Sequence, residues 1–126
     1  MRTTTSLLRM GLLMKRGKIY YANLSPTVGS EINKKRPVLI VSNDANNRAA
    51  STVTVLPITS NIANIYPFEI KLTRADSSLA KDSKAQAQQI RTLSKERIPG
   101  RAIGKLGSAK MRLVEAAMRL HLGLNG

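Results

Sequence analysis

The sequence predicts a small, mainly β-structured domain with one C-terminal helix, and three features support this prediction. The chain has 126 residues, which is enough for a single hydrophobic core. Most of its apolar residues lie in short runs, which are separated by polar segments that contain Gly, Pro, Asn or Asp. Only the last segment repeats its apolar residues at helical spacing. Several short strands followed by one helix are typical of a small, mostly antiparallel β-barrel.

The first two strands are expected on either side of a polar loop. Residues 18–24 (KIYYANL) have the β-branched, aromatic and apolar positions of a strand. Residues 25–35 contain Pro, Gly and several polar side chains, and should form the loop. Arg36 precedes a proline, so its backbone should be extended and lead into the next strand. That strand, residues 37–42 (PVLIVS), is almost continuously apolar, as expected of a strand covered on both faces.

The middle of the chain predicts two more strands. Residues 43–50 (NDANNRAA) should form a turn or a single helical turn, and residues 52–58 (TVTVLPI) a third strand. Pro57 cannot donate a backbone hydrogen bond, which indicates a sheet edge or a bulge at that point. Residues 68–72 (FEIKL) alternate between apolar and polar side chains, which is typical of a half-exposed strand.

The last third of the chain should contain short extended segments and then the helix. Residues 74–83 are polar and predict a loop, whereas residues 85–93 should be extended and residues 98–106 should hold a short strand. The helix is expected to begin after an N-cap at Ser108 and to end at a C-cap at Gly123.

This helix should have one apolar and one polar face. The residues expected on the apolar face are Met111, Val114, Met118 and Leu122. The residues expected on the polar face are Arg112, Glu115 and Arg119, of which Glu115 and Arg119 are spaced to form an ion pair.

The charge of the chain favours a polyanionic partner. Lys and Arg number 21 against 7 Asp and Glu, which gives a net charge of +14. Such a field attracts nucleic acid, although an anionic membrane, an acidic protein or simple solubility in a basic proteome also fits it. Aromatic residues make up only 3% of the chain, so a binding sheet with several stacking aromatics is not expected. Cysteine is absent, which excludes disulfides and thiolate chemistry.

Residues 1–14 are expected to be a disordered leader or the product of a start codon assigned too early, and residues 15–126 to form the domain. The first residues resemble a signal peptide only weakly, because Arg9 interrupts a short apolar stretch. No segment approaches the length of a membrane span, so a cytoplasmic protein without membrane association is expected.

Three kinds of nuclease site can be compared with the residues present. A histidine pair is excluded, because His121 is the single histidine and is expected to be a packing or capping residue. The acidic residues lack the spacing of a metal site, so neither a metal nor another cofactor is expected. The third kind uses the 2′-hydroxyl of RNA as nucleophile, assisted by proton transfer and positive charge. Glu31 and Arg36 flank one loop and can supply such groups, although composition alone favours a pair of surface residues without a role.

Four segments, in order, resemble toxins of the MazF/PemK family. They are RGKIYYANLSPTVGSEINKKRPVLIVSND, VTVLPITSNI, QQIRTLSKERI and LVEAAMRLHLGL. The resemblance implies the toxin of a type II toxin–antitoxin system, with an SH3-like barrel and a C-terminal helix. It implies a sequence-selective endoribonuclease that works as a homodimer and binds single-stranded RNA, such as mRNA, across the dimer interface. It also implies a cognate antitoxin whose acidic, otherwise disordered tail blocks that groove, and contact with DNA only through the antitoxin complex.

The resemblance also implies site residues by position. Arg36 matches the family's catalytic arginine and Thr59 its catalytic threonine, and Glu31 is a third candidate. Arg36 would stabilise the charge on the scissile phosphate, and the Thr59 hydroxyl would hydrogen-bond a phosphate oxygen or the 2′-hydroxyl. Residues 32–35 (INKK) replace the Gln and Gly that are common in the family, so the base preference of relatives is not transferred.

Four further residues are expected to bind RNA: Thr27, Ser30, Gln89 and Arg91. Gln89 and Arg91 alternate along a segment expected to be extended, so both side chains should face one groove. Gln89 can recognise base edges, and Arg91 can contact phosphate or stack on a base.

Three other functions stay open. A non-catalytic RNA-binding module would bind RNA without cutting it, and a membrane-surface peptide would depend on residues 1–13. A toxin of the same fold that acts on gyrase would rely on a terminal Trp-Gly-Ile, whereas this chain ends in residues 123–126, Gly-Leu-Asn-Gly.

Overall fold

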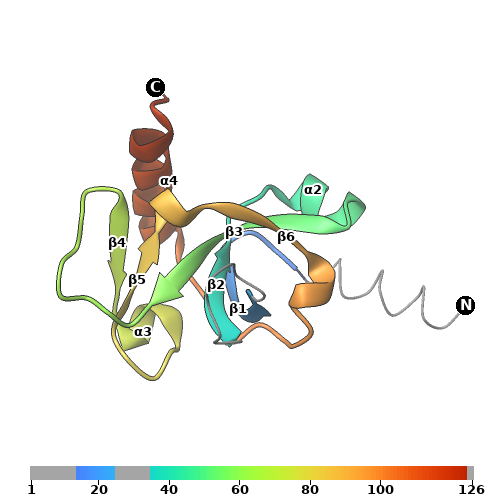
Figure 1. Cartoon of the computed structure of the whole chain (residues 1–126), viewed down its shortest axis with the longest axis horizontal. Helices are drawn as coiled ribbons and strands as arrows, with labels where there is room; N and C mark the ends of the chain where they lie inside the picture. The colour runs from blue at the N-terminus through green and yellow to red at the C-terminus, as the bar shows by residue number, and fades with distance from the viewer. Residues whose placement is uncertain (1–13, 25–34, 125–126) are drawn as a thin grey trace, which may run out of the picture.

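The strands form one curled antiparallel sheet with a long helix on one side (Figure 1). The computed structural model describes residues 14–24 and 35–124. The elements are β1 (Lys18–Asn23), β2 (Lys35–Ile40), α2 (Asp44–Ala49), β3 (Thr52–Thr59), β4 (Glu69–Leu72), α3 (Arg74–Ser77), β5 (Ser83–Gln86), η1 (Ala87–Gln89), β6 (Arg91–Ser94), η2 (Lys95–Arg97), β7 (Gly104–Lys105) and α4 (Ser108–Leu122). The strand order is β4-β5-β3-β2-β1-β7, and β6 also pairs with β3. The predicted mainly β fold with a C-terminal helix is therefore confirmed.

The central strand, β3, changes its partner along its length. One side of β3 pairs with β2, while the other pairs first with β6 and then with β5. Val55 pairs with Arg91, and Ile58 pairs with Ala85. These two pairs are three residues apart in β3 but six residues apart in the neighbouring segment. The three extra residues correspond to η1, which interrupts what is otherwise one strand. Pro57 lies beside this interruption and pairs with Val38 within the sheet, so the predicted sheet edge is wrong. The extra residues belong to the neighbouring segment, and a bulge at Pro57 itself stays a prediction.

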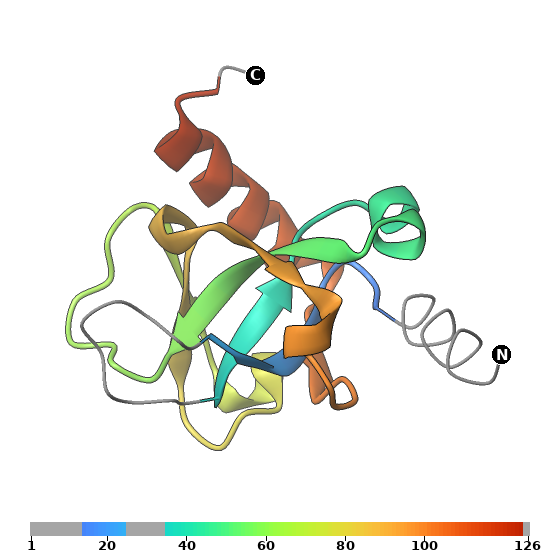
Figure 2. The ribbon, with the colours of Figure 1, turned by 45° about the vertical axis from the view of Figure 1, so that its right-hand side comes forward.

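Alternating residues of the strands contribute to two hydrophobic clusters, one on each face of the sheet. On one face, the strand residues Ile19, Leu39 and Leu56 pack with α4, which buries Met111, Val114 and Ala117. On the other face, the cluster consists of Met14, Tyr20, Ala22, Val38, Ile40, Val53, Val55, Leu93 and Ile98. Figure 2 shows α4 crossing behind β3, so α4 covers only the first of these faces. Burial of each large apolar side chain contributes about 1.5–3 kcal/mol to folding.

The segment after β4 differs from the sequence prediction. Residues 74–83 were expected to be a loop, but α3 forms at their start. The Thr73 hydroxyl accepts a hydrogen bond from the backbone N–H of Asp76 (3.1 Å), and the Asp76 carboxylate accepts one from the backbone N–H of Thr73 (2.9 Å). This reciprocal capping box stabilises a helix too short to show an apolar repeat. The strand expected within residues 98–106 is reduced to β7, which pairs with β1.

Helix α4 lies close to its expected position, with one shift at each end. Its N-cap is Gly107 rather than Ser108, whereas the predicted C-cap at Gly123 is confirmed by a left-handed backbone (φ 69°). Leu122 was expected on the apolar face but is 49% exposed, because the last turn of α4 extends beyond the sheet (Figure 1).

The polar face of α4 uses a different ion pair from the expected one. Glu115 pairs with Arg16 (2.9 Å), which lies just before β1, and thereby ties the helix to the start of the domain. The predicted pairing of Glu115 with Arg119 is not the one that forms.

The ends of the domain are consistent with the prediction but do not test it. The boundary expected between residues 14 and 15 stays a prediction, because residues 1–13 lie outside the described residues. Within residues 14–24 and 35–124, no helix has the length and apolar character needed to cross a membrane.

Candidate functional site

Arg36 and Thr59 lie at the same end of the paired strands β2 and β3. In the β2–β3 pair, Val38 lies opposite Pro57 and Leu39 opposite Leu56. The paired register ends at Val38 and Pro57, and Arg36 and Thr59 each lie two residues beyond it within their strands. Because side chains alternate along a strand, Arg36 lies on the face of Val38 and Thr59 on the face of Pro57. Two residues that are 23 positions apart in the sequence therefore lie on one face, at the same end of the β2–β3 pair.

A row of side chains continues from Thr59 across the next two strands. Thr59 pairs with Lys84 of β5, and Lys84 pairs with Lys71 of β4. Arg36, Thr59, Lys84 and Lys71 thus form a cross-strand row, which we call the cationic row. Arg36 alternates with Val38, whose cluster lies on the face of the sheet away from α4, so the row projects from that face.

The two expected catalytic side chains are accessible. Arg36 is exposed, and none of the described residues forms an ion pair with it. Thr59 is half-buried at the end of β3, and its Oγ1 accepts a hydrogen bond from the backbone N–H of Asn61 (3.2 Å). Because a hydroxyl also has one hydrogen to donate, Thr59 keeps its O–H available for a phosphate oxygen.

Lys84 and Glu69 form a buried ion pair next to Thr59. The Nζ of Lys84 lies 2.9 Å from Oε1 of Glu69, and the two side chains are 9% and 1% exposed. The same Nζ donates a hydrogen bond to the carbonyl oxygen of Asn64 (2.6 Å). The charge of Lys84 is therefore largely neutralised within the protein, and its main role is structural.

Glu69 is the centre of a larger hydrogen-bond network. Besides Lys84, its carboxylate accepts hydrogen bonds from the backbone N–H of Tyr66 (3.0 Å) and from the side-chain amides of Gln88 (2.6 Å) and Gln86 (3.4 Å). Burial by itself raises the pKa of Glu69, but the bonds from Lys84, Tyr66, Gln88 and Gln86 outweigh it and lower the pKa from 4.5 to about 2. Glu69 is therefore ionised at neutral pH.

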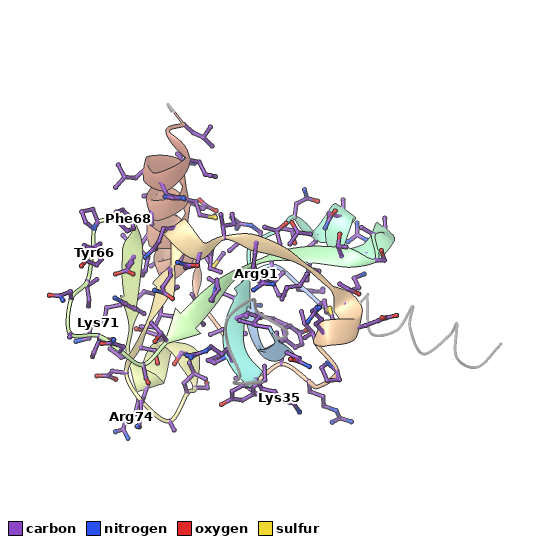
Figure 3. The ribbon with its side chains drawn as sticks, in the orientation of Figure 1. Lys35, Tyr66, Phe68, Lys71, Arg74 and Arg91 are labelled. Carbon is purple, nitrogen blue, oxygen red and sulfur yellow. The ribbon has the colours of Figure 1, made fainter. Side chains whose placement is uncertain are left out.

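Arg91 lies on the same face of the sheet as Arg36 and Thr59. It pairs with Val55, which alternates with Pro57 and Thr59 along β3. Figure 3 shows Arg91 over the middle of the sheet, away from the edge formed by β4. The expected RNA-binding arginine and the expected catalytic pair thus share one face.

Gln89 does not follow the geometry expected for it. It is exposed, but it ends the short helix η1 rather than lying in one extended segment with Arg91. The alternation argument for these two residues is therefore wrong, because the three residues of η1 break the strand. A role of Gln89 in RNA binding stays a prediction.

The remaining expected site residues are Thr27, Ser30 and Glu31, and they lie outside the described residues. Their places relative to Arg36 and Thr59 stay predictions. The described residues contain no group of three or more His, Cys, Asp or Glu side chains that could hold a metal ion.

Sequence reasoning did not identify Lys84, Glu69 or Lys71 as part of this face. Each lies in a short strand, and only the cross-strand register makes it a neighbour of Thr59. The one sequence signal was the charged pair Glu69 and Lys71, two residues apart in β4, which places both side chains on one face.

Comparison with known proteins identifies the family. A family model described as "PemK-like, MazF-like toxin of type II toxin-antitoxin system" matches residues 15–122. Endoribonuclease MazF9 of Mycobacterium tuberculosis is 43% identical over 117 residues, covering 89% of this chain and 98% of that protein. Endoribonuclease MazF of Staphylococcus saprophyticus is 39% identical over 114 residues, covering 90% of this chain and 94% of that protein.

Solved structures share the fold. A mycobacterial endoribonuclease in complex with its cognate antitoxin superposes with a TM-score of 0.73 at 27% identity, covering 90% of this chain and 98% of that one. MazF from Deinococcus radiodurans, at 24% identity, has the same TM-score of 0.73, covers 89% of this chain and 98% of that one, and so supports the fold alone. With the family model matching from before β1 to the end of α4, the chain belongs to the PemK-like, MazF-like toxins of type II toxin–antitoxin systems.

Proposed function

We propose that this MazF-family endoribonuclease toxin cuts single-stranded RNA without a metal ion, by attack of the ribose 2′-hydroxyl on the adjacent phosphate. The observation that carries the proposal is that Arg36 and Thr59 lie at the same end of the β2–β3 pair, on a face of the sheet that also holds Arg91. Its support from relatives is that two of them, covered over nearly their whole length, are named endoribonucleases.

The two side chains have different tasks in this mechanism. The Arg36 guanidinium presents several N–H donors and a permanent positive charge, which stabilise the extra negative charge of the phosphorane-like transition state. The Thr59 hydroxyl donates a hydrogen bond to a phosphate oxygen or to the attacking 2′-oxygen, which aligns the two. A threonine hydroxyl is too weak a base to remove the proton alone, so we assign that step to Glu31 as the third candidate.

The products follow from the identity of the nucleophile. When the 2′-oxygen gives its proton to Glu31 and bonds to phosphorus, the bond from phosphorus to the 5′-oxygen breaks, and that oxygen takes up a proton from water. The upstream fragment then carries a 2′,3′-cyclic phosphate and the downstream fragment a 5′-hydroxyl.

We further propose the partners that such a toxin needs in the cytoplasm. The mycobacterial structure of the same fold is a complex with its cognate antitoxin, and a chain with a net charge of +14 suits an antitoxin with an acidic tail. A homodimer is supported by apolar side chains that lie outside both clusters on α4, since Leu113 and Leu120 are 51% and 57% exposed.

The roles of Arg36 and Thr59 are tested by substitution. We expect Arg36→Ala and Thr59→Ala each to reduce cleavage of a mixed-sequence single-stranded RNA by at least about 100-fold, the usual loss when a transition-state donor is removed. Thr59→Ser keeps the hydroxyl and should retain most activity. Arg36→Lys keeps the charge but loses the paired donors, so its activity should lie between that of the unmodified chain and that of Arg36→Ala.

Thermal unfolding separates catalysis from folding in the same variants. Both alanine variants should melt within a few degrees of the unmodified chain, because Arg36 is exposed and Thr59 loses only its bond to Asn61. Full cleavage by folded Arg36→Ala and Thr59→Ala would refute these roles. RNA binding without any cleavage by the unmodified chain would favour a non-catalytic RNA-binding module.

A further inference from the structure

Tyr66 is the most exposed of the chain's four aromatic residues. The chain has three Tyr, one Phe and no Trp. Tyr20 is buried, Phe68 is half-buried, and Tyr21 and Tyr66 are 44% and 51% exposed. Tyr66 lies between β3 and β4, in the segment that follows Thr59. An exposed tyrosine ring beside a cationic face has the chemistry to bind a nucleobase.

The backbone of Tyr66 is held at both of its polar groups. Its N–H donates to Oε1 of Glu69 (3.0 Å), and its carbonyl oxygen accepts from the backbone N–H of Glu69 (2.9 Å). Glu69 itself is fixed by the buried ion pair with Lys84. The position of the ring is therefore set before any ligand binds, which lowers the entropy cost of stacking.

The ring of Tyr66 is also oriented by its neighbours. It is stacked on Phe68, with ring centroids 5.7 Å apart and planes inclined by 13°. The Nζ of Lys84 lies 5.6 Å from the centroid of the Tyr66 ring. Figure 3 shows Tyr66 and Phe68 side by side at the β4 edge, with Lys71 farther along the same edge. The ring thus stands beside Lys84 of the cationic row.

Lys84 connects this ring to the catalytic threonine. Lys84 is the cross-strand partner of Thr59, and adjacent strands are only about 4.8 Å apart. An RNA strand with one phosphate at Arg36 and Thr59 can therefore bring the base of a neighbouring nucleotide to Tyr66. The exposed Lys71, in the same row, is placed to neutralise a phosphate of that nucleotide.

We propose that Tyr66 is a base-binding residue, which stacks on an unpaired base of the substrate next to the phosphate held at Arg36 and Thr59. This inference rests on the proposed function and adds to it a determinant of substrate binding outside residues 25–34. Stacking does not require hydrogen bonds to the base edge, so Tyr66 contributes affinity for any unpaired base and little selectivity among the four.

Kinetics of the full chain on a single-stranded RNA test the proposal. We expect Tyr66→Ala to raise KM about tenfold and to change kcat less than about twofold, because stacking holds the substrate without touching the reacting atoms. Tyr66→Phe keeps the ring and should behave like the unmodified chain. Tyr66→Leu keeps apolar volume without the ring and should resemble Tyr66→Ala. Tyr21→Ala removes the other exposed tyrosine, which lies on the opposite face from Arg36, and should leave KM unchanged.

Cross-linking supplies a second measurement that needs no variant. We take an RNA sequence that the chain cuts and replace the sugar at the scissile position by 2′-deoxyribose, which prevents cleavage. In a series of such RNAs, 5-iodouracil is placed at one position after another. Irradiation of each RNA in complex with the unmodified chain should couple one position to Tyr66, as located by mass spectrometry.

The two measurements separate this proposal from the proposed function. An unchanged KM for Tyr66→Ala, or cross-links elsewhere but none to Tyr66, would overturn the stacking role while cleavage by the unmodified chain still stands. If Tyr66→Ala does not fold, the KM of Tyr66→Leu and the cross-link decide. Absence of cleavage by the unmodified chain would instead refute the proposed function.

Discussion

At the scale of single residues, the ion pair of Glu69 and Lys84 is a nearly fully buried polar contact. Both side chains are buried, and Glu69 accepts four hydrogen bonds. Burial disfavours the ionised carboxylate, but these four partners favour it more strongly, which explains the low pKa of Glu69. The pair also holds the backbone of Asn64 and Tyr66, so it connects the stability of the domain with the shape of the segment that follows Thr59.

Removing the charge of Glu69 should destabilise the protein strongly. We expect Glu69→Gln to lower the free energy of unfolding by about 3 kcal/mol at pH 7, because Lys84 is left buried without its partner. Chemical denaturation measures this loss. The matched control is Glu96→Gln, which changes an exposed glutamate in η2 and should cost less than about 0.5 kcal/mol. Equal stability of Glu69→Gln and the unmodified chain would mean that the pair is not intact.

The same carboxylate predicts a pH dependence of stability. Because the pKa of Glu69 is lower in the folded state than its ordinary value of 4.5, its contribution is complete above pH 4.5 and is lost as the pH falls to about 2. Hydrogen bonds also lower the pKa of Asp44 and Asp76, so acid destabilises the domain by other routes too. The stability difference between the unmodified chain and Glu69→Gln isolates the part due to Glu69, and it should shrink across this range.

At the scale of elements, the interruption of β5 and β6 by η1 shapes the site. On one side, β3 pairs with β6 at its N-terminal part and with β5 at its C-terminal end. η1 joins β5 to β6 and changes the register between them. β5 places Lys84 beside Thr59, and β6 places Arg91 beside Val55. Gln88, within η1, reaches Glu69 (2.6 Å), so the interruption also supports the buried ion pair.

A second element contact is the close approach of β7 to α3. A Cβ added to Gly104 would overlap the backbone carbonyl of Ser77, whereas one added to Gly100 would meet nothing within 4 Å. We expect Gly104→Ala to destabilise the domain by about 1–3 kcal/mol, because the backbone of α3 must shift to relieve the overlap. Gly100→Ala is the matched control and should leave the melting temperature almost unchanged. A Gly104→Ala variant as stable as the control would show that α3 moves away freely.

At the scale of the whole molecule, the two faces of the sheet have separate tasks. α4 covers one face and buries Met111, Val114 and Ala117 there. The other face has an apolar cluster of its own, and the cationic row and Arg91 project from it. This separation lets a small domain hold a rigid core and still present a cationic surface to a polyanion.

The charge predicts how RNA affinity depends on salt. The logarithm of the association constant should fall linearly with the logarithm of salt concentration, by about 0.7 for each phosphate neutralised on a single strand. When Arg91→Ala is added to Thr59→Ala, which we expect to be inactive, the slope should flatten by about 0.7. Arg112→Ala removes an exposed arginine from α4, behind the sheet, and should leave the slope unchanged. If the slope is the same with and without Arg91→Ala, RNA does not bind at Arg91.

Local patterns predicted the elements better than their contacts. The apolar runs predicted β1, β2 and β3, and the helical repeat predicted α4, because each depends on residues close in sequence. α3 was missed, since a single turn has no repeat and its capping box is its only signal. Leu122 was misassigned because α4 extends beyond the end of the sheet there. Glu115 was misassigned because Arg16, which is distant in sequence, lies within reach of it.

The candidate site was predictable in full only where a family motif supplied it. Arg36 was already a candidate from its place beside the polar loop, but its match to a catalytic arginine and the choice of Thr59 came from the resemblance. The register of β2 and β3 then places both residues on one face of the sheet. Lys84 and Tyr66 could not be predicted, because their relation to Thr59 depends on which strand pairs with which. The extended geometry assumed for Gln89 and Arg91 failed because no local signal marks η1.

The end groups of cut RNA test the central claim most directly. The unmodified chain is incubated with single-stranded RNA in EDTA, and the ends of the fragments are determined. Attack by the 2′-hydroxyl, assisted by Arg36 and Thr59 without a metal ion, predicts cleavage that leaves a 2′,3′-cyclic phosphate and a 5′-hydroxyl. Cleavage that needs Mg²⁺, or fragments that carry a 5′-phosphate and a free 3′-hydroxyl, would contradict the account.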